Sequence, residues 1–511
     1  MASPEVLIVG AGPAGLALAC GLRLHGVPVR VVDKAAGPAT TSRANFLHAR
    51  GAEVLDRLGA LGDLPKRAIS ALTITVHAGG KPISTLRFGD AGLRTSRPAL
   101  LVSQAAVEAE LRRRLAELGI TVQWSTVLVE ASADDNGVTA VLADGNTVRA
   151  GWLAGCDGAH STVRKLAAIG FPGVAVADQW LLADVYADGM PDRSGSHGWL
   201  HRDGLLGALP MRQDATSRDD LWRLMAYLPG AEDEKMNQRQ IVDHLHQVVP
   251  QRTGLSEFHI HGTAWTSLFR IHRRLAEDYR RGRILLVGDA AHIHSPIGGQ
   301  GMLTGIGDAE NLAWKLALVT RGKAVETLLD TYQAERRPLA AEVLRTTSAN
   351  TRFQTGDGTL VRFLRERVMA PLLNRPWVQR WATAVASQLW VSYRRGPLAG
   401  AGMRFGHRPR PGDRVPNMRC RRVDGSITRL HAELGGHWVL LDSGGEGAEV
   451  ARKWLGEYVT ILTTGDSATG VSGFGQTLLI RPDAHLAWRG RPRSDGLRRW
   501  LAEALSNGKT R

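Results

Sequence analysis

The 511-residue sequence predicts an α/β fold in which a parallel-sheet unit is interrupted by strands of a second sheet. Two glycine-rich segments, GAGPAG at Gly10–Gly15 and GDAAHIHSPIGGQG at Gly288–Gly301, each end a short apolar run and open an apparent helix. Between them, Leu205–Leu209 and Leu221–Leu228 have the pattern of antiparallel strands in a flatter sheet. We therefore expect the insertions to form a separate domain that covers the first one.

The first glycine-rich turn has the spacing of a dinucleotide-binding unit. Val6–Val9 is a short apolar strand, and Leu16–Leu24 carries apolar residues at helical intervals. Between them, Gly10, Gly12 and Gly15 permit a tight turn and let the backbone approach a pyrophosphate at the positive end of the helix. A glycine-rich turn in an unrelated α/β unit is the alternative.

An acidic residue follows the second expected strand. Val29–Val32 is mostly apolar and ends at Asp33, close to the position of an acidic ribose ligand in such units. Lys34 is a further candidate for contact with the adenosine end. Because a second glycine-rich turn lies far along the chain, we infer that one long cofactor is held at both ends, and that this cofactor is FAD.

Composition excludes several classes of protein. Hydrophobic residues make up 43% of the chain, enough for two to four domains with real cores, and no run approaches the roughly 20 apolar residues that span a bilayer. The first strand follows the N-terminus without a secretion-signal pattern, and Cys20, Cys156 and Cys420 are too far apart to indicate a disulfide framework or a zinc cluster. We expect no metal, no membrane association and a reducing, cytoplasmic location.

The net charge of +15 needs its own interpretation. Nucleic-acid binding favours a basic tail or patch with aromatic residues between the charges, but here the arginines are scattered and aromatic residues make up only 6%. We therefore predict no nucleic-acid partner. A positive field would instead draw anionic FAD and NADPH toward the protein.

Periodicity predicts the remaining elements. Helices are expected at 51–61, 104–118, 448–458 and 495–505, a mainly helical stretch runs from 326 to about 395, and strands are expected at 72–76, 83–88, 121–124, 127–133, 138–142, 283–287, 438–441 and 460–462. A third strand-to-turn segment, WLAGCDGAHSTVR, covers Trp152–Arg164. Arg404–Pro416, rich in Pro, Arg and Gly, predicts a linker before a separate C-terminal α/β unit.

Three segments in this order, GAGPAG, CDGAHSTVR and RILLVGDAAHIHSPIGGQGMLTGIGDAENLAWKL, resemble the single-component class A FAD-dependent aromatic hydroxylases, specifically the bacterial branch that acts on polyketides and related antibiotics. The resemblance covers Pro4–Leu318 strongly. It extends more weakly to the C-terminus, where PGDRVPNM and LIRPDAHLAWRG are similar to a thioredoxin-like appendage of some members. Since the appendage has no paired cysteines, we expect a scaffold or dimer contact there and no redox role.

The resemblance implies a Rossmann-like FAD-binding domain of the GR2 type, an inserted mixed β-sheet substrate domain and a C-terminal thioredoxin-like α/β domain. The expected boundaries are 1–71, 101–174 and 280–325 for the three parts of the FAD-binding domain, 72–100 and 175–279 for the substrate domain, 326–400 for a helical segment and 401–511 for the thioredoxin-like domain.

The resemblance also assigns residues to the cofactor. They are Gly10, Gly12, Pro13, Ala14, Gly15, Asp33, Lys34, Arg43, Gln104, Leu128, Asp157, Gly158, Asp289, Pro296, Gly299, Gly301, Met302 and Leu303. Without it, Arg43 fits an ordinary surface charge and Gln104 a helix-start cap. Backbone atoms of Val127 or Leu128 are expected against the adenine. Asp157, with the following glycine, is expected to serve both FAD and the passing nicotinamide cofactor, unless the segment is only a turn with a capped helix start.

The second glycine-rich turn is implied to lie against the flavin. Asp289 is expected to accept hydrogen bonds from sugar hydroxyls, with an N-cap of the next helix as its alternative. The Pro296 carbonyl is expected to face the C4a region of the flavin, and it is the only catalytic contact that the resemblance suggests. Gly298, with Gly299 and Gly301, allows the backbone to approach the ring, and Met302 and Leu303 offer N–H groups to its pyrimidine edge, at a helix N-terminus that favours negative charge.

Two positions depart from the family pattern. Leu303 stands where relatives usually have asparagine, and Gly307 where many have glutamine, so two side-chain amides near the flavin are missing. His292 and His294 flank the turn, and we interpret the pair as structural because no third ligand indicates a metal site.

The resemblance implies a monooxygenase that uses NADPH or NADH and O2. A flavin C4a-hydroperoxide would transfer one oxygen atom to a polycyclic aromatic substrate of polyketide type. Candidate substrate residues are Met211, Arg212, Trp222 and Met225, each of which fits a core or surface position equally well. Baeyer–Villiger insertion, antibiotic-inactivating oxygenation, an NAD-dependent dehydrogenase and a non-catalytic flavin- or drug-binding protein remain alternatives, and a homodimer is possible.

Overall fold

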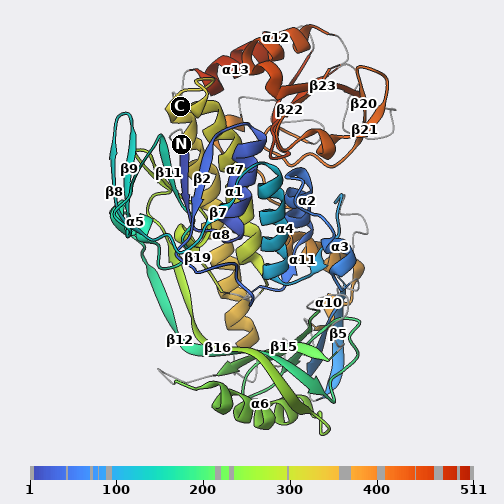
Figure 1. Cartoon of the computed structure of the whole chain (residues 1–511). Coiled ribbons are helices and arrows are strands. Elements are labelled where there is room, and N and C mark those ends of the chain that lie inside the picture. The colour runs from blue at the N-terminus through green and yellow to red at the C-terminus, as the bar shows by residue number, and fades with distance from the viewer. Residues whose placement is uncertain are drawn as a thin grey trace.

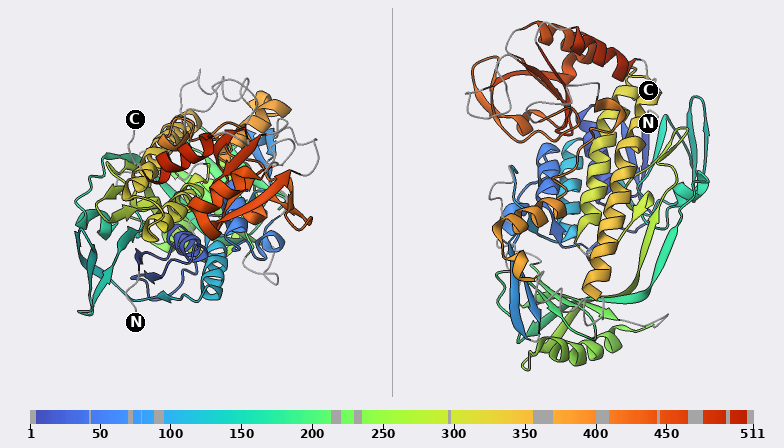
Figure 2. Two further views of the ribbon diagram at one scale, coloured as in Figure 1. Left: turned by 90° about the horizontal axis from the view of Figure 1, so that it is seen from above. Right: turned by 180° about the vertical axis from the view of Figure 1, so that it is seen from behind.

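The computed structural model describes residues 5–41, 44–69, 73–78, 80–87, 95–212, 220–228, 235–295, 298–355, 370–399, 409–442, 445–464, 476–491 and 495–506. The chain forms an elongated molecule with a helix-covered parallel sheet in the middle, a large β-sheet at one end and the C-terminal domain at the other (Figure 1). The view from behind shows the same order, with long central helices running between the two ends (Figure 2).

The central domain is built on a six-stranded sheet with the order β17-β18-β11-β1-β2-β7. Its strands are β1 (Val6–Val9), β2 (Val29–Val32), β7 (Val122–Gln123), β11 (Trp152–Gly155), β17 (Arg280–Arg281) and β18 (Ile284–Leu286). All pairs are parallel except the short edge pair β17–β18. Strands β1, β11 and β18 are fully buried, as expected for a parallel sheet covered on both faces. The strands predicted at Val6–Val9 and Val29–Val32 are confirmed.

Helices cover this sheet and carry the turns of interest. They are α1 (Pro13–Leu24), α2 (Ala49–Arg57), α3 (Leu64–Arg67), α4 (Gln104–Glu117), α5 (Thr162–Leu166) and α7 (Gln300–Thr320). Helices α1 and α7 cross closely, because a Cβ built on Gly21 would lie 2.7 Å from the Cβ of Ala313. Two small sheets flank the domain: β3 (Phe46–Leu47) with β6 (Leu100–Leu101), and β8 (Leu128–Asp134), β9 (Gly137–Leu142) and β10 (Thr147–Ala150).

The second large sheet has eight strands in the order β19-β16-β12-β15-β14-β13-β4-β5. They are β4 (Thr73–Ala78), β5 (Lys81–Arg87), β12 (Gly173–Asp188), β13 (Ser196–Leu200), β14 (Leu206–Pro210), β15 (Leu221–Leu228), β16 (His259–Leu275) and β19 (His292–Ile293). The sheet is mixed, since β4 and β13 are parallel and the other pairs antiparallel. The long strands β12 and β16 run from the central domain into this sheet, and α6 (Gln238–Thr253) covers its outer face (Figure 1).

A C-terminal domain packs on the far end of α7. Its strands are β20 (Arg419–Arg422), β21 (Ile427–Arg429), β22 (Trp438–Leu441), β23 (Val459–Thr464), β24 (Thr477–Ile480) and β25 (Leu486–Gly490), with helices α12 (Glu446–Leu455) and α13 (Gly496–Leu505). Before it come α8 (Asp330–Thr355), α10 (Ala370–Leu373) and α11 (Pro376–Ala386). Trp314 of α7 meets Trp438 edge to face, with ring centroids 5.0 Å apart. The thioredoxin-like description and the domain boundaries stay predictions.

Within the described residues, no helix is long and apolar enough to cross a membrane. Cys20, Cys156 and Cys420 are buried and unpaired, and the described part of the chain holds no group of three or more side chains suited to a metal ion.

Candidate functional site

The first glycine-rich turn is crowded on one side and open on the other. At Gly10 φ is +107°, and a Cβ there would lie 2.3 Å from the carbonyl oxygen of Cys156. A Cβ on Gly15 would lie 2.0 Å from the Gly10 carbonyl oxygen. At Gly12, by contrast, no atom of the described residues lies within 4 Å of such a Cβ. The open space therefore lies at Gly12, the N-cap of α1, whose N–H groups have no side-chain cap there.

Pro13 and Ala14 begin α1, and Ala14 packs against the second glycine-rich turn. Pro13 stands at the first helical position, where its missing N–H costs nothing. A Cβ built on Gly288, where φ is +63°, would lie 3.0 Å from the Cβ of Ala14 and 3.6 Å from Cα of Gly305 in α7. The two turns, far apart in sequence, are thus direct neighbours at the end of the parallel sheet, so one ligand can contact both.

Asp33 lies half-buried beside the first turn. Its carboxylate accepts the N–H groups of Ala11 at 2.7 Å and Ala35 at 2.8 Å, which fixes it at the end of β2. A carboxylate has about four acceptor positions, so two remain for ribose hydroxyls. Lys34 is exposed next to it. Arg43 lies outside the described residues.

Gln104 and Leu128 are placed by the backbone around them. Gln104 is the first residue of α4, its N–H donates to the Ala44 carbonyl at 2.8 Å, and its side-chain amide donates to Glu108 at 2.8 Å. Burial raises the pKa of Glu108. The Leu128 side chain is buried in the core, so that residue can offer only backbone atoms to a ligand. The preceding Val127 carbonyl already accepts the N–H of Ala143 at 2.9 Å.

Asp157 follows β11 beside the Gly10 turn. Its carboxylate accepts the Ser161 hydroxyl at 2.5 Å and the N–H groups of Thr162 and Val163 at 2.7 and 3.1 Å. This carboxylate therefore helps to hold the start of α5, whose N-cap residue is Ser161, and its expected role toward FAD and the nicotinamide cofactor stays a prediction. Gly158 has φ of +77°, and a Cβ there would meet no described atom within 4 Å, so its backbone remains approachable.

Asp289 is an exposed residue on an otherwise buried turn after β18. It belongs to a short 3-10 helix, Gly288–Ala290, whose N-cap is Val287, while the N-cap of α7 is Gly299. Asp289 is thus the N-cap of neither helix, and the capping alternative is not what the structure shows. Its exposed carboxylate stands next to the contact between Gly288 and Ala14.

Two consecutive glycines in left-handed conformations lead into α7. Gly298 has φ of +93° and Gly299 has φ of +61°. The ring Nε2 of His48 lies 2.8 Å from the Gly298 carbonyl oxygen, and burial lowers the pKa of His48 to about 4, so a neutral ring donates this hydrogen bond. Phe46 packs on the His48 ring and on Gly299. Pro296 lies outside the described residues.

The N-terminus of α7 is the second place where backbone donors are left over. No described side chain caps it, so the N–H groups of Gln300, Gly301 and Met302 have no partner within the helix. The side chains of Met302 and Leu303 are buried, which leaves only their backbone for a ligand. The 21 residues of α7 place the positive end of a long helix dipole at this turn.

Buried charged residues contact the other end of the second glycine-rich turn, at Gly288. Asp308 accepts His292 Nε2 at 2.7 Å, Arg336 Nε at 2.6 Å and the Gly288 N–H at 3.2 Å. Burial by itself would raise the pKa of Asp308, but Arg336 and His292 outweigh it and hold the pKa below its ordinary value. His292 thus lies buried beside Asp308, which is compatible with the structural role expected for it, while sequence reasoning missed Asp308 and Arg336.

The eight-stranded sheet presents one face to the central domain. On β15, Trp222 and Leu224 point into the core against α6, on the outer face. Met225 is on the opposite face, where it packs with Trp180, Tyr227, Leu205 and Phe269. The face of Met225 is directed toward the central domain, since α6 covers the other one (Figure 1).

A buried ion pair lies on the same face as Met225. Arg223 donates two hydrogen bonds of 2.7 Å to Asp184, and sequence reasoning missed this pair. Of the other candidate substrate residues, Met211 is buried and its carbonyl accepts Arg193 at 2.6 Å, whereas Arg212 is exposed at the margin of the sheet. The structure therefore places Met225 on the face toward the glycine turns and Trp222 away from it.

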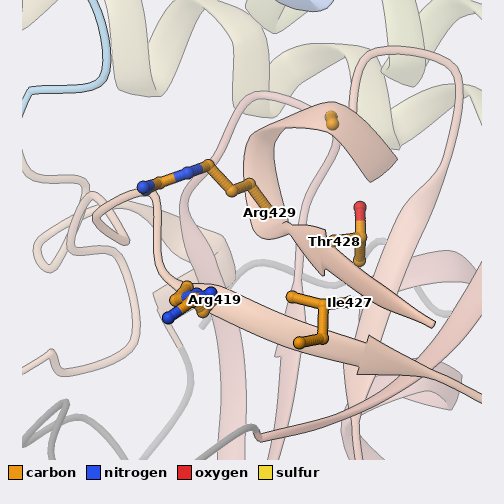
Figure 3. A pocket seen from close by; sticks show the side chains of 5 residues that line it. Arg419, Ile427, Thr428 and Arg429 are labelled. Atoms are coloured by element: carbon orange, nitrogen blue, oxygen red, sulfur yellow. The ribbon is translucent and has the colours of Figure 1, made fainter. Parts of the chain in front are cut away.

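A surface hollow on the C-terminal domain is separate from these turns. It is lined by Arg419, Ile427, Thr428, Arg429 and Ala432 (Figure 3). Its lining residues come from β20, β21 and the 3-10 segment Leu430–Glu433, all in the C-terminal domain.

The arrangement fits FAD. Gly12 offers open space at a helix N-terminus, Asp33 has acceptor positions left beside it, and a second uncapped helix N-terminus follows Gly299 in the second turn. An FAD-binding domain model matches residues 3–347, and an aromatic-ring hydroxylase C-terminal domain model matches residues 408–507. The chain therefore belongs to the FAD-dependent aromatic-ring hydroxylases.

Individual relatives agree with this assignment. The chain is 36% identical to a 12-dehydrotetracycline 5-monooxygenase/anhydrotetracycline 6-monooxygenase of Streptomyces rimosus, over 97% of this chain and 98% of that one. It is 33% identical to a rifampicin monooxygenase of Streptomyces venezuelae, over 98% and 99%. The solved structure of OxyS anhydrotetracycline hydroxylase from Streptomyces rimosus matches with a TM-score of 0.80 and 32% identity, over 99% and 100%. The protein is a flavin-dependent monooxygenase that uses FAD, O2 and a reduced nicotinamide co-substrate.

Proposed function

We propose that the enzyme hydroxylates a polycyclic aromatic substrate of polyketide type, bound between the start of α7 and the Met225 face of the large sheet. The observation that carries the proposal is the apolar lining of that face: Trp180, Tyr227, Met225 and Phe269 pack together on the side of the sheet that α6 does not cover. Flat, electron-rich ring systems bind well to aromatic and Met side chains. Similarity to tetracycline-type monooxygenases supports the same substrate class.

At the adenosine end, we propose that Gly12 and the N-terminus of α1 hold the pyrophosphate, with Asp33 on the ribose. Gly10 and Gly15 act indirectly, since each allows a backbone approach that no other residue permits. Gln104 and Lys34 are proposed to border the same end, with Arg43 from outside the described residues. Since the carboxylate of Asp157 is occupied by its cap, we propose that Gly158 contacts the cofactor through its backbone.

At the flavin end, we propose that Asp289 accepts hydrogen bonds from sugar hydroxyls and that the backbone of Gly299, Gly301, Met302 and Leu303 borders the ring. Bound FAD supplies the redox chemistry and the activation of oxygen. The role of the chain is to place the positive end of α7 next to the ring, which stabilises negative charge on it. The proposed role of the Pro296 carbonyl concerns a residue outside the described ones and stays a prediction.

At the substrate end, we propose that Met225 lines the pocket and that the Arg223–Asp184 pair keeps β12 and β15 in register behind it. Both charged groups are buried and paired, so the face stays largely apolar and excludes water. Met211 and Arg212 are proposed only for the rim. Trp222 is not retained, because it packs against α6.

The test is coupled turnover. The purified enzyme, loaded with FAD, is mixed with NADPH or NADH and a panel of polycyclic phenols, and nicotinamide oxidation and oxygen uptake are followed together. We expect a subset of the panel to accelerate both, with a product that carries one added hydroxyl group. A panel that binds without accelerating either would favour a non-catalytic flavoprotein.

A second candidate is oxygenation of a finished antibiotic, which the similarity to a rifampicin monooxygenase favours. The same assay with rifampicin-like compounds separates the two, and product structure distinguishes hydroxylation from Baeyer–Villiger insertion.

A further inference from the structure

Gln388 has a backbone conformation that is uncommon for its residue type. Its φ is +52°, in the left-handed region. It follows the last turn of α11, where the Gln388 N–H donates to the Val385 carbonyl at 3.1 Å and the Leu389 N–H donates to the Ala384 carbonyl at 2.9 Å. Helices that end in this way usually have glycine at that position, because a Cβ is strained there. An observed outlier of this kind suggests that the side chain serves a purpose.

The Gln388 side chain is buried against the first turns of α7. Its amide nitrogen donates to the Thr304 hydroxyl at 2.8 Å and lies 3.3 Å from Oε1 of Gln300. The Thr304 hydroxyl in turn donates to the Gln300 carbonyl at 2.8 Å. Gln388 and Thr304 are 2% and 0% exposed, so these hydrogen bonds form away from water, where they restrict movement most.

The backbone of Gln388 is tied to the C-terminal domain. Its carbonyl accepts Nη1 of Arg50 at 3.0 Å, and Nη2 of the same arginine lies 3.3 Å from Nε2 of His485. The His485 ring packs on Tyr393, with centroids 4.4 Å apart. His485, Arg50 and Gln388 therefore form a continuous buried connection from the C-terminal domain to the start of α7.

We propose that Gln388 is a positioning residue for the flavin ring, which fixes the first turn of α7 and ties it through Arg50 to the C-terminal domain. The inference rests on the proposed placement of the ring at residues 298–303. The Gln388 amide hydrogen-bonds Gln300 and Thr304. It therefore fixes the orientation of the backbone N–H groups at the start of α7 that have no partner within the helix. The C-terminal domain thereby acts on the flavin site without touching it.

The test compares two substitutions that accept the left-handed backbone. Gln388→Gly removes the strain and the amide together, and Gln388→Asn keeps an amide that is one methylene too short to reach Thr304. For both, relief of the backbone strain (in the glycine variant) or its tolerance (in the asparagine variant) offsets only part of the lost hydrogen bonding, so we expect a small fall in the melting temperature of the apoprotein. We expect the Kd for FAD to rise about tenfold, with a changed visible spectrum and reduction potential of the bound flavin.

Trp500→Phe is the matched control. It removes a buried N–H that donates to the Leu398 carbonyl at 3.2 Å within the C-terminal part of the chain. We expect it to lower the melting temperature and to leave FAD affinity and the flavin spectrum unchanged. His485→Leu should shift the flavin spectrum in the same direction as Gln388→Gly, because it releases Arg50.

The outcomes separate the two proposals. If wild-type protein binds FAD and both Gln388 variants bind it with the same Kd and spectrum, the inference is overturned while the proposed function stands. If FAD affinity falls only in proportion to the melting temperature, Gln388 is merely structural and the inference is again overturned. Wild-type protein that binds no FAD would overturn the proposed function itself.

Discussion

The His48 ring donates a 2.8 Å hydrogen bond to the carbonyl oxygen of Gly298, two residues before α7 begins. Burial lowers the pKa of His48 to about 4, so this donor is neutral and present at all pH values near neutrality. We predict that His48→Leu weakens FAD binding by about 1 kcal/mol, or roughly fivefold in Kd, because the turn loses one hydrogen bond. His48→Gln keeps a side-chain N–H and should retain most of the affinity. Equal losses in both variants would show that ring packing, and not the hydrogen bond, holds the turn.

Asp289 provides a test of the proposed sugar contact. We predict that Asp289→Ala weakens FAD binding by about 1–3 kcal/mol through loss of charge-assisted hydrogen bonds. Urea denaturation of the apoprotein should accompany the titration, so that a loss of FAD affinity can be told apart from a loss of stability. Asp243→Ala, at an exposed site on α6, serves as the control for a lost negative charge. Fluorescence titration of apoprotein with FAD gives the comparison, and an unchanged Kd would remove Asp289 from the site.

Substitutions at two adjacent residues of β15, Leu224 and Met225, distinguish an effect on substrate binding from an effect on stability. Leu224 is fully buried against α6, so Leu224→Ala should cost about 3 kcal/mol in free energy of unfolding and leave KM for the aromatic substrate unchanged. Met225 lies half-buried on the other face, so Met225→Ala should raise KM about tenfold with a small effect on stability. Urea denaturation and steady-state kinetics measure the two effects. The opposite pattern would mean that substrate binds elsewhere.

Stability should fall in mild acid because several histidines are buried in the neutral form. Burial lowers the pKa of His25 to about 3, and in the unfolded chain it returns to about 6.5. Between these values the unfolded state binds one more proton, so stability decreases as pH falls from about 6.5 toward 3. At pH 5 each such histidine has lowered the free energy of unfolding by about 2 kcal/mol.

His25→Phe tests this linkage. No described atom hydrogen-bonds His25 Nε2, so the substitution leaves no partner unsatisfied. We predict that the variant loses about 2 kcal/mol less than wild type between pH 7 and pH 5. Parallel losses in the two proteins, measured by urea denaturation at both values, would show that His25 does not contribute.

The sequence predicts the buried strands well and the long ones poorly. Val6–Val9 and Trp438–Leu441 are continuous apolar runs, which buried strands require, and both are confirmed. The strands β12 and β16 were missed because each runs through two domains and changes its surroundings along its length. In β16, the sequence HIHGTAWTSLFRIHRRL shows neither a steady alternation nor an apolar run.

In the candidate site, too, some features were predictable from the sequence and others were not. Local turns such as Gly10–Gly15 carry their own signal, because the backbone itself needs glycine there. The face of Met225 could not be chosen from one sequence, since it depends on which side α6 covers. His48 and Gln388 carry no motif, because they reach the turn at 298–304 only through tertiary contacts.

FAD titration of Gly12→Val apoprotein tests the central claim most directly, with Gly10→Ala as its counterpart. The Gly12 site has an ordinary φ of −75° and open space for a side chain, so the variant should fold with the melting temperature of wild type and bind FAD at least about 100-fold more weakly. Gly10→Ala should instead lower the melting temperature of the apoprotein, because its Cβ would clash with the Cys156 carbonyl. A folded Gly12→Val protein with wild-type affinity for FAD would contradict the account.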